Sequence, residues 1–188
     1  MKDINYVRAM AQNCIEELNA IGLYPQITAN DFFINTSIQK TLGVCWRNKK
    51  GYTNNKYMIE ISTRMLGDDV LEEGLRLTIL HELCHASDIT FKDGHTGKWK
   101  EWAELVNDCY AVNIQRCILT AKYNIPPRKQ PPKKKYVCEC KHCGGEVWRI
   151  GCRAPKWYSL TEKHMANGYY HKCADGTHGQ LINPHIEY

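Results

Sequence analysis

The chain has 188 residues, of which 43% are hydrophobic and 24% charged, and its net charge is +5. This length allows one moderate hydrophobic core and a small accessory module. There is no run of about 18 apolar residues, and residues 1–14 lack the apolar core of a secretory signal. The sequence therefore predicts a soluble, cytoplasmic or otherwise intracellular protein with no membrane partner.

The N-terminal part of the chain combines one predicted helix with three predicted strands. Residues 4–20 place apolar side chains at helical spacing, and Gly22 is typical of the residue that ends a helix. The β-prone stretches that follow are residues 31–35, 42–48 and 57–62. We interpret residues 56–62 as an edge strand beside the helix that comes next.

That next helix carries the most informative motif of the chain, His81-Glu-Leu-Cys-His85. Asp69 and Glu72 have the spacing of a capping box, and apolar residues at helical spacing then predict a helix over residues 70–87. Two imidazoles four residues apart face the same side of a helix, so both can bind one metal ion, with Glu82 as the general base. This is the layout of a zinc peptidase, in which an edge strand commonly holds the extended substrate.

A catalytic zinc normally takes three protein ligands, so a third ligand is expected downstream. His95 is the first candidate, because it lies in a turn-rich segment that can bring an imidazole back to the motif. A second amphipathic helix is predicted over residues 97–120. Glu104 on that helix is the competing ligand, since it follows His85 at about the distance at which another class of zinc peptidase places a glutamate.

A basic, proline-rich segment marks the predicted domain boundary. Residues 122–137 hold 6 basic and no acidic side chains. The sequence predicts a domain of residues 1–124, a linker of residues 125–136 and a second domain of residues 137–188. The linker is either a solvated tether or a phosphate-binding cluster. The cations of this cluster are Arg128, Lys129, Lys133, Lys134 and Lys135.

Five of the 10 cysteines crowd the last quarter of the chain, which in an intracellular protein is typical of a metal module. Cys140-Lys-His-Cys143 is a metal-binding knuckle, and its partner half is expected about 30 residues further on. The ligands predicted for a structural zinc are Cys140, Cys143, Cys173 and His178, with Cys138, Cys152 and His171 as alternatives. Residues 137–188 are therefore interpreted as a zinc ribbon that depends on its ion to fold.

These segments resemble the SprT-like metalloprotease family, which includes the Spartan proteases that degrade proteins crosslinked to DNA. The resemblance lies in HELCHASD at residues 81–88, DGHTGKWKEW at residues 93–102, the basic linker and the cysteine-rich tail. The tail departs from the family, whose second Cys-x-x-Cys pair is replaced here by Cys173-x4-His178. The resemblance implies an α+β, zincin-like protease domain in which His81, His85 and His95 bind a catalytic zinc and Glu82 is the catalytic base.

The residues and the resemblance together predict a zinc endopeptidase with two zinc ions, one catalytic and one structural. The expected role is in DNA repair, on DNA-associated or DNA-crosslinked proteins. The expected partners are protein substrates and DNA, with the linker cations on the DNA, and the chain is expected to be a monomer. Two alternatives stay open: a nucleic-acid-binding zinc protein without protease activity, and a zinc peptidase that acts independently of DNA.

Overall fold

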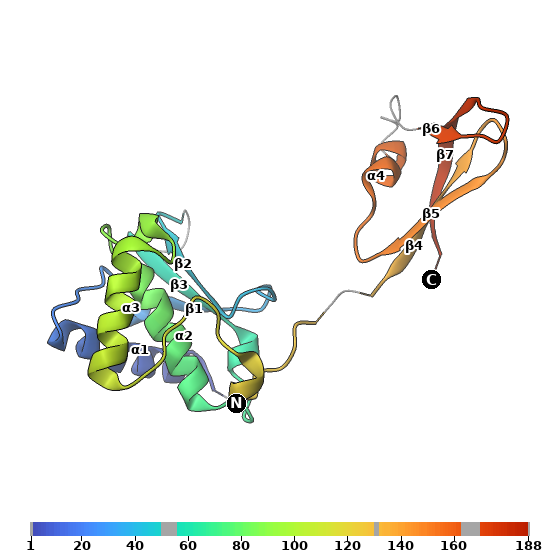
Figure 1. The fold of residues 1–188 in the computed structure, drawn as a ribbon. Helices are drawn as coiled ribbons and strands as arrows, with labels where there is room; N and C mark the ends of the chain where they lie inside the picture. The colour runs from blue at the N-terminus through green and yellow to red at the C-terminus, as the bar shows by residue number, and fades with distance from the viewer. Residues whose placement is uncertain (1, 50–55, 130–131, 163–169, 188) are drawn as a thin grey trace. The chain divides into compact units, whose positions relative to one another are not determined.

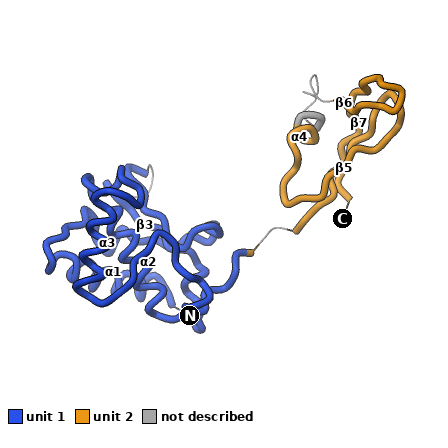
Figure 2. The backbone as a smooth tube through the Cα atoms, viewed as in Figure 1, with its two compact units in different colours: residues 1–128 blue, residues 129–188 orange. Residues whose placement is uncertain are grey.

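The structure is a computed structural model that describes residues 2–49, 56–129, 132–162 and 170–187. The chain divides into two compact units, residues 1–128 and residues 129–188 (Figure 2). In chain order, the first unit contains α1 (Ile4–Ala20), β1 (Phe32–Asn35), β2 (Gly43–Arg47), β3 (Tyr57–Ser62), α2 (Glu72–His85) and α3 (Gly97–Tyr110) (Figure 1). The second contains β4 (Lys134–Cys140), β5 (Glu146–Gly151), α4 (Lys156–Glu162), β6 (Tyr170–Lys172) and β7 (His178–Glu187).

The mixed α and β architecture agrees with the predicted class, and α1 with its three following strands lies where the sequence placed them. The carboxylate of Asp3 caps α1 by accepting a hydrogen bond from the Tyr6 N–H at 2.9 Å. Gly22, with a φ of 80°, follows the helix in the left-handed region that glycine tolerates. The buried side of α1 packs into the main core through Val7, Met10, Ala11, Cys14, Ile15 and Leu18.

The sheet of the first unit has the strand order β1-β3-β2, so β3 lies in the centre. It runs parallel to β1 and antiparallel to β2. The prediction that residues 56–62 form the edge strand is therefore wrong. All residues of β3 are buried, because Tyr57, Ile59 and Ile61 pack into the helical core while Glu60 points to the other side. The edge strand that packs against α2 is β2, whose Trp46 is 40% exposed.

α2 begins at Glu72, and its N-cap residue, Leu71, makes no side-chain cap. The predicted capping box with Asp69 as N-cap is therefore wrong. The Leu71 N–H instead donates to the Tyr123 carbonyl at 3.0 Å, and Glu72 and Glu73 stand in the first turn, where negative charge is favourable. Because α2 is packed on most of its circumference, tertiary contacts set its position more strongly than a local cap does.

α3 ends at Tyr110, so the predicted helix over residues 97–120 is wrong in its second half. Ala111 is left-handed with a φ of 51°, which ends the helix. The Asn107 side chain then holds the backbone of Ile114 twice, accepting from its N–H at 2.6 Å and donating to its carbonyl at 3.2 Å. Residues 111–118, here called the strap, therefore leave the helix and run back toward α2.

The second unit is a four-stranded sheet of order β5-β4-β7-β6. α4 packs on one face of it, where the Tyr158 and Tyr136 rings lie 5.1 Å apart between centroids. The predicted linker of residues 125–136 overlaps ordered structure at both ends. Ile125 is buried in the core of the first unit, and Lys134 already belongs to β4. Within the described residues, no helix is long and apolar enough to cross a membrane.

Candidate metal centre

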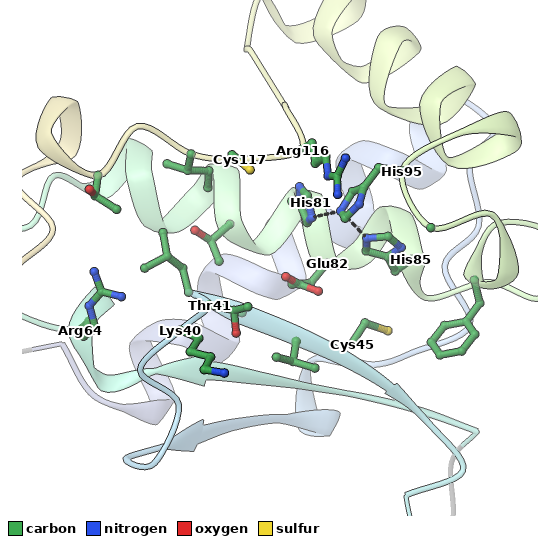
Figure 3. Close-up of a pocket in the computed structure, with 18 residues that line it drawn as sticks. Lys40, Thr41, Cys45, Arg64, His81, Glu82, His85, His95, Arg116 and Cys117 are labelled. Atoms are coloured by element: carbon green, nitrogen blue, oxygen red, sulfur yellow. Dashed lines mark hydrogen bonds between the residues drawn. The ribbon is translucent and has the colours of Figure 1, made fainter. Parts of the chain in front are cut away.

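Three imidazoles converge beside the cleft of the first unit (Figure 3). His81 and His85 lie one turn apart on α2, and His95 reaches them from the segment before α3. The His95 Nε2 atom lies 3.0 Å from the Nε2 of His81 and 3.3 Å from the Nε2 of His85. The structure thus brings together the three histidines that the sequence singled out.

Local backbone geometry brings His95 to this point. Gly94 has a φ of 59°, in the region that glycine adopts without strain. The carboxylate of Asp93 accepts a hydrogen bond from the Lys98 N–H at 2.7 Å, which fixes the start of α3. Glu104, the competing third ligand, is exposed and forms an ion pair with Lys100 at 3.4 Å. It is not part of the cluster, so the geometry favours His95.

The protonation of the imidazoles suits a cation. The His81 Nδ1 lies 2.9 Å from the carbonyl of Gln115 in the strap. A carbonyl can only accept, so Nδ1 carries the proton and Nε2 presents a lone pair to the other two rings. Burial lowers the pKa of His81 to about 4 and that of His85 to about 3, and it also lowers the pKa of His95. All three imidazoles are therefore neutral at pH 7.

The distances from the His95 Nε2 to the Nε2 atoms of His81 and His85 fit zinc. Zinc–nitrogen bonds of ~2.0–2.1 Å in a tetrahedral arrangement place the ligand atoms about 3.3 Å apart. Trp99 closes the far side of the cluster, since its ring centroid lies 4.9, 5.2 and 4.7 Å from those of His81, His85 and His95. It is 3% exposed, so the three rings have little freedom to turn away.

Glu82 lies between the three-histidine cluster and β2 and is 7% exposed. Burial raises the pKa of its carboxyl to about 8, although a hydrogen bond from the Cys45 backbone N–H acts in the opposite direction. A β-carbon added at Gly43 would lie 2.7 Å from Glu82 Cγ and 2.8 Å from its Oε1. Strand and helix can approach this closely only because residue 43 has no side chain.

A second cluster lies in the other unit and contains Cys140, Cys143 and Cys173. The sulfurs of Cys140 and Cys173 are 3.6 Å apart, near the ~3.8 Å expected for two thiolates on one tetrahedral zinc. Hydrogen bonds, the largest from the Cys143 backbone, lower the pKa of Cys140 to about 7, which favours the thiolate. Burial raises the pKa of Cys173 to about 11. None of the chain's cysteines, all of which are described, forms a disulfide.

His178, the predicted fourth ligand of this cluster, is not brought to the sulfurs. In the β6–β7 register, His178 pairs with Lys172, whereas His171 pairs with Gly179. A β-carbon on Gly179 would overlap the Cys140 sulfur, so Gly179 and its partner His171 face the cluster and His178 faces the other side. The alternatives Cys138, Cys152 and His171 are likewise outside the group of three sulfurs, although His171 faces it.

Comparison with known proteins agrees with this geometry. The sequence profile of the SprT-like family matches residues 11–120, more than half of the chain. The chain belongs to the SprT-like family. The match runs from the middle of α1 to just beyond the strap, and therefore covers all three histidines and Glu82.

Two curated relatives are similar over the same region. The germ cell nuclear acidic protein of Drosophila melanogaster is 30% identical over 108 residues, which are 56% of this chain and 9% of that protein. The germ cell nuclear acidic-1 protein of Caenorhabditis elegans is 30% identical over 121 residues, 61% of this chain and 20% of that protein. The chain thus spans a small part of the length of these relatives. No solved structure matches it significantly.

The three-histidine cluster of this SprT-like domain lines a cleft of about 510 Å³. One wall is formed by β2 and the residues before it, including Lys40, Thr41 and Cys45. The opposite wall is formed by the strap through Arg116 and Cys117, with Glu82 and the histidines between the two walls (Figure 3). Neither Gly43 nor the strap had a signal in the sequence analysis.

Replacing Gly43 with alanine is expected to lower any peptide cleavage at this site by about 10²-fold, with little change in the binding of added zinc. The new β-carbon displaces Glu82, and a shift of about 1 Å at a reacting group can have an effect of this size. Cleavage of a short peptide and the zinc content are the two measurements. Gly67→Ala is the matched control, since its β-carbon would meet only Val70, at 3.5 Å. Equal activity of the two variants would contradict the assigned position of Glu82.

Proposed function

We propose that the chain is a zinc-dependent endopeptidase of SprT-like type, with a zincin-like catalytic domain and a C-terminal zinc ribbon, that acts on DNA-associated or DNA-crosslinked proteins. One observation carries the proposal. Three neutral imidazoles face a single point at the edge of a cleft, and a buried carboxylate that is not needed as a ligand stands beside them. A structural zinc site needs no such carboxylate, whereas hydrolysis does.

The residues of the cleft divide the chemistry between them. Zinc, when bound by His81, His85 and His95, supplies Lewis acidity that polarises the scissile carbonyl and makes a water molecule more acidic. A cation held by the three histidines would favour the ionised form of Glu82 despite its burial. In that form Glu82 takes a proton from the water and later delivers it to the leaving amine nitrogen. The β2 edge faces the cleft, so an extended peptide can pair with it by strand addition.

The second unit is proposed to hold a structural zinc ion. Cys140, Cys143 and Cys173 supply three sulfur ligands, and the sheet register makes His171 a better fourth ligand than His178. Among the described residues of this unit, the hydrophobic cluster is small and has four buried side chains. An ion that joins the knuckle to β6 and β7 therefore contributes directly to folding.

DNA binding is proposed for the second unit and the basic segment before it. Arg128, Lys129 and Lys133 are exposed, as phosphate contacts require. Lys135 differs from the expected pattern, because it forms an ion pair with Glu187 at 2.7 Å. On the same face of the sheet, Trp148 and Ile150 are 57% and 56% exposed, an apolar surface on which unpaired bases can stack.

The experiment that tests the whole proposal compares cleavage of a DNA-binding protein by the full chain with and without DNA. We expect cleavage that requires zinc and increases when enzyme and substrate share one DNA molecule. Cleavage that is equal without DNA would support a peptidase acting independently of DNA. The absence of cleavage in both conditions, together with tight DNA binding, would support the nucleic-acid-binding alternative.

Neutralising the exposed cations is expected to flatten the salt dependence of DNA binding. Each phosphate contact contributes a slope of about −0.9 in log affinity against log salt on duplex DNA, and about −0.7 on single strands. The variant changes Arg128, Lys129 and Lys133 to glutamine, and the measurement is DNA affinity against salt concentration. Cleavage of an unstructured peptide should be unaffected, because these residues lie outside the cleft.

The matched control for this prediction removes cations that are already paired. Lys98 and Lys100 form ion pairs with Glu101 and Glu104 on the exposed side of α3. Their change to glutamine should leave the slope as it is. A slope that is the same in the parent and in the three-residue variant would show that the basic segment is a tether and that any DNA binding belongs to the rest of the second unit.

A further inference from the structure

The strap holds a cation against the metal centre. Its backbone is fixed twice before it reaches the cleft, by Asn107 at Ile114 and by the His81 ring at the carbonyl of Gln115. Ile114 is 5% exposed and packs in the core. The next residue, Arg116, therefore leaves the backbone at a position set by a ligand of the metal centre and cannot drift far from it.

The Arg116 side chain points along the cleft wall toward the histidines. Figure 3 shows its guanidinium beside His95 and His81, across the cleft from β2, with Glu82 on the β2 side. After burial, the charge of Arg116 is the other cause that lowers the pKa of His95, which agrees with this proximity. The cleft thus has a proton acceptor, Glu82, on its β2 side and a hydrogen-bond donor, Arg116, on its strap side.

The guanidinium has no structural task in the described parts of the chain. No hydrogen bond or ion pair joins Arg116 to another described residue, and the side chain is exposed to the cleft. Arg64, which also lines the cleft, differs in this respect. It donates to the Gln39 carbonyl at 2.9 Å and to the Pro126 carbonyl at 2.8 and 3.0 Å, so its role is structural.

Peptide hydrolysis creates a need for such a donor. The water oxygen bonds to the carbonyl carbon, the carbon–nitrogen bond then breaks, and Glu82 carries a proton from the water to the amine nitrogen. Between these steps, negative charge accumulates on the former carbonyl oxygen. A guanidinium can donate charge-assisted N–H hydrogen bonds to such an oxygen, and it stays charged at all working pH values.

We propose that Arg116 is a further catalytic residue, which donates hydrogen bonds to the carbonyl oxygen of the scissile peptide bond as that oxygen becomes negative. The proposal rests on the proposed peptidase function and adds a residue to it. It assigns the two cleft walls different tasks, with proton transfer on the β2 side and charge stabilisation on the strap side.

The test uses Arg116→Gln and Arg116→Lys in the full chain, with zinc content, melting temperature, kcat and KM measured on a peptide whose two ends are blocked. Loss of one such donor typically lowers kcat by about 10²- to 10³-fold. We expect that loss in Arg116→Gln with KM nearly unchanged and the zinc retained, and a smaller loss in Arg116→Lys. Lys92→Gln removes a charge three residues from His95 but outside the cleft lining, and should match the parent.

A binding measurement separates this role from simple attraction of substrate. A phosphinic peptide carries a tetrahedral, negatively charged group where the reacting carbonyl stands, so it imitates the charged state. Arg116→Gln should weaken binding of the phosphinic peptide by about 10²-fold, and should leave binding of the matching substrate peptide unchanged when both are measured in a Glu82→Gln background.

Each other result has a defined meaning. Equal weakening of both peptides, or a rise in KM at constant kcat, would overturn the proposal in favour of general electrostatic attraction. Loss of zinc would make Arg116 structural and would also overturn it. A parent that does not cleave the peptide would overturn the peptidase function itself, whereas a cleaving parent matched by Arg116→Gln would overturn only the role of Arg116.

Discussion

Replacing Glu82 with glutamine is expected to lower kcat/KM by at least ~10²-fold while the variant keeps its fold and its zinc. The amide has the same shape as the carboxylate and can still accept the hydrogen bond from the Cys45 N–H, but it cannot take a proton from water. Glu82 is not a member of the histidine cluster, so metal binding does not depend on it. The melting temperature should not fall, since the buried site then holds an uncharged group in place of an ionisable one.

The measurement combines peptide cleavage with the zinc content of the purified variant. Proteolysis at the parent's rate would remove the enzyme function and leave the nucleic-acid-binding alternative. Loss of zinc in this variant would show that Glu82 is a ligand, and the division of tasks between the histidines and the carboxylate would then be wrong. Gly43→Ala adds an independent check, because it displaces the same carboxylate without removing it.

Replacing His95 with alanine is expected to abolish proteolysis and to reduce bound zinc from two ions per chain to one. Two imidazoles on one helix remain, which is one ligand short of the usual catalytic site. Cys140→Ser should remove the other ion and leave the first in place. Zinc counted by elemental analysis is the measurement, and Glu104→Ala, which should keep both ions, is the control. Retention of both ions in His95→Ala would contradict the ligand assignment.

The same zinc measurement decides the fourth ligand of the second unit. His171→Ala should release that ion at a lower chelator concentration than the parent does, because its side chain faces the sulfurs. His178→Ala should behave as the parent, since its side chain faces the other side of the sheet. The opposite result would restore the ligand set predicted from sequence spacing.

Local patterns predicted the elements that their own residues determine. The helix of residues 4–20 and the strands near residues 31–35, 42–48 and 57–62 follow from hydrophobic periodicity and turn residues, which act over a few positions. The approach of His95 to His81 and His85 was predictable because a motif with two ligands calls for a third, and Asp93-Gly-His95 offered a turn of the right kind.

Contacts between distant residues set the features that were missed. The order of the strands depends on which strand lies between two others. All residues of β3 are buried because β1 and β2 flank it and other parts of the chain pack on it, which the sequence of β3 does not reveal. α3 ends at Tyr110 because Ala111 is left-handed and the Asn107 side chain binds the backbone of Ile114. The spacing of apolar residues after Tyr110 nevertheless suggests a longer helix. The sequence around Gly43 contains no motif that marks this glycine. Its role, which is to leave room for Glu82, follows only from the packing of α2 against β2.

The choice between His171 and His178 shows how small such a difference can be. The sequence offers both at suitable spacing after the knuckle, and only the pairing register of β6 with β7 separates them. A shift of one residue in that register would exchange their faces. Spacing along the chain therefore identifies a metal module more easily than it identifies the last of its ligands.

The hydrogen bond from His81 to the Gln115 carbonyl makes metal binding and strap order two parts of one equilibrium. If the proton moved from Nδ1 to Nε2, the ring would lose its lone pair toward the ion and would also turn a lone pair against the carbonyl. An ion at Nε2 therefore favours the tautomer that donates to the Gln115 carbonyl, and that hydrogen bond favours the ion by the same free energy. A substitution in the strap that removes this hydrogen bond would therefore weaken metal binding without altering any of the three ligands.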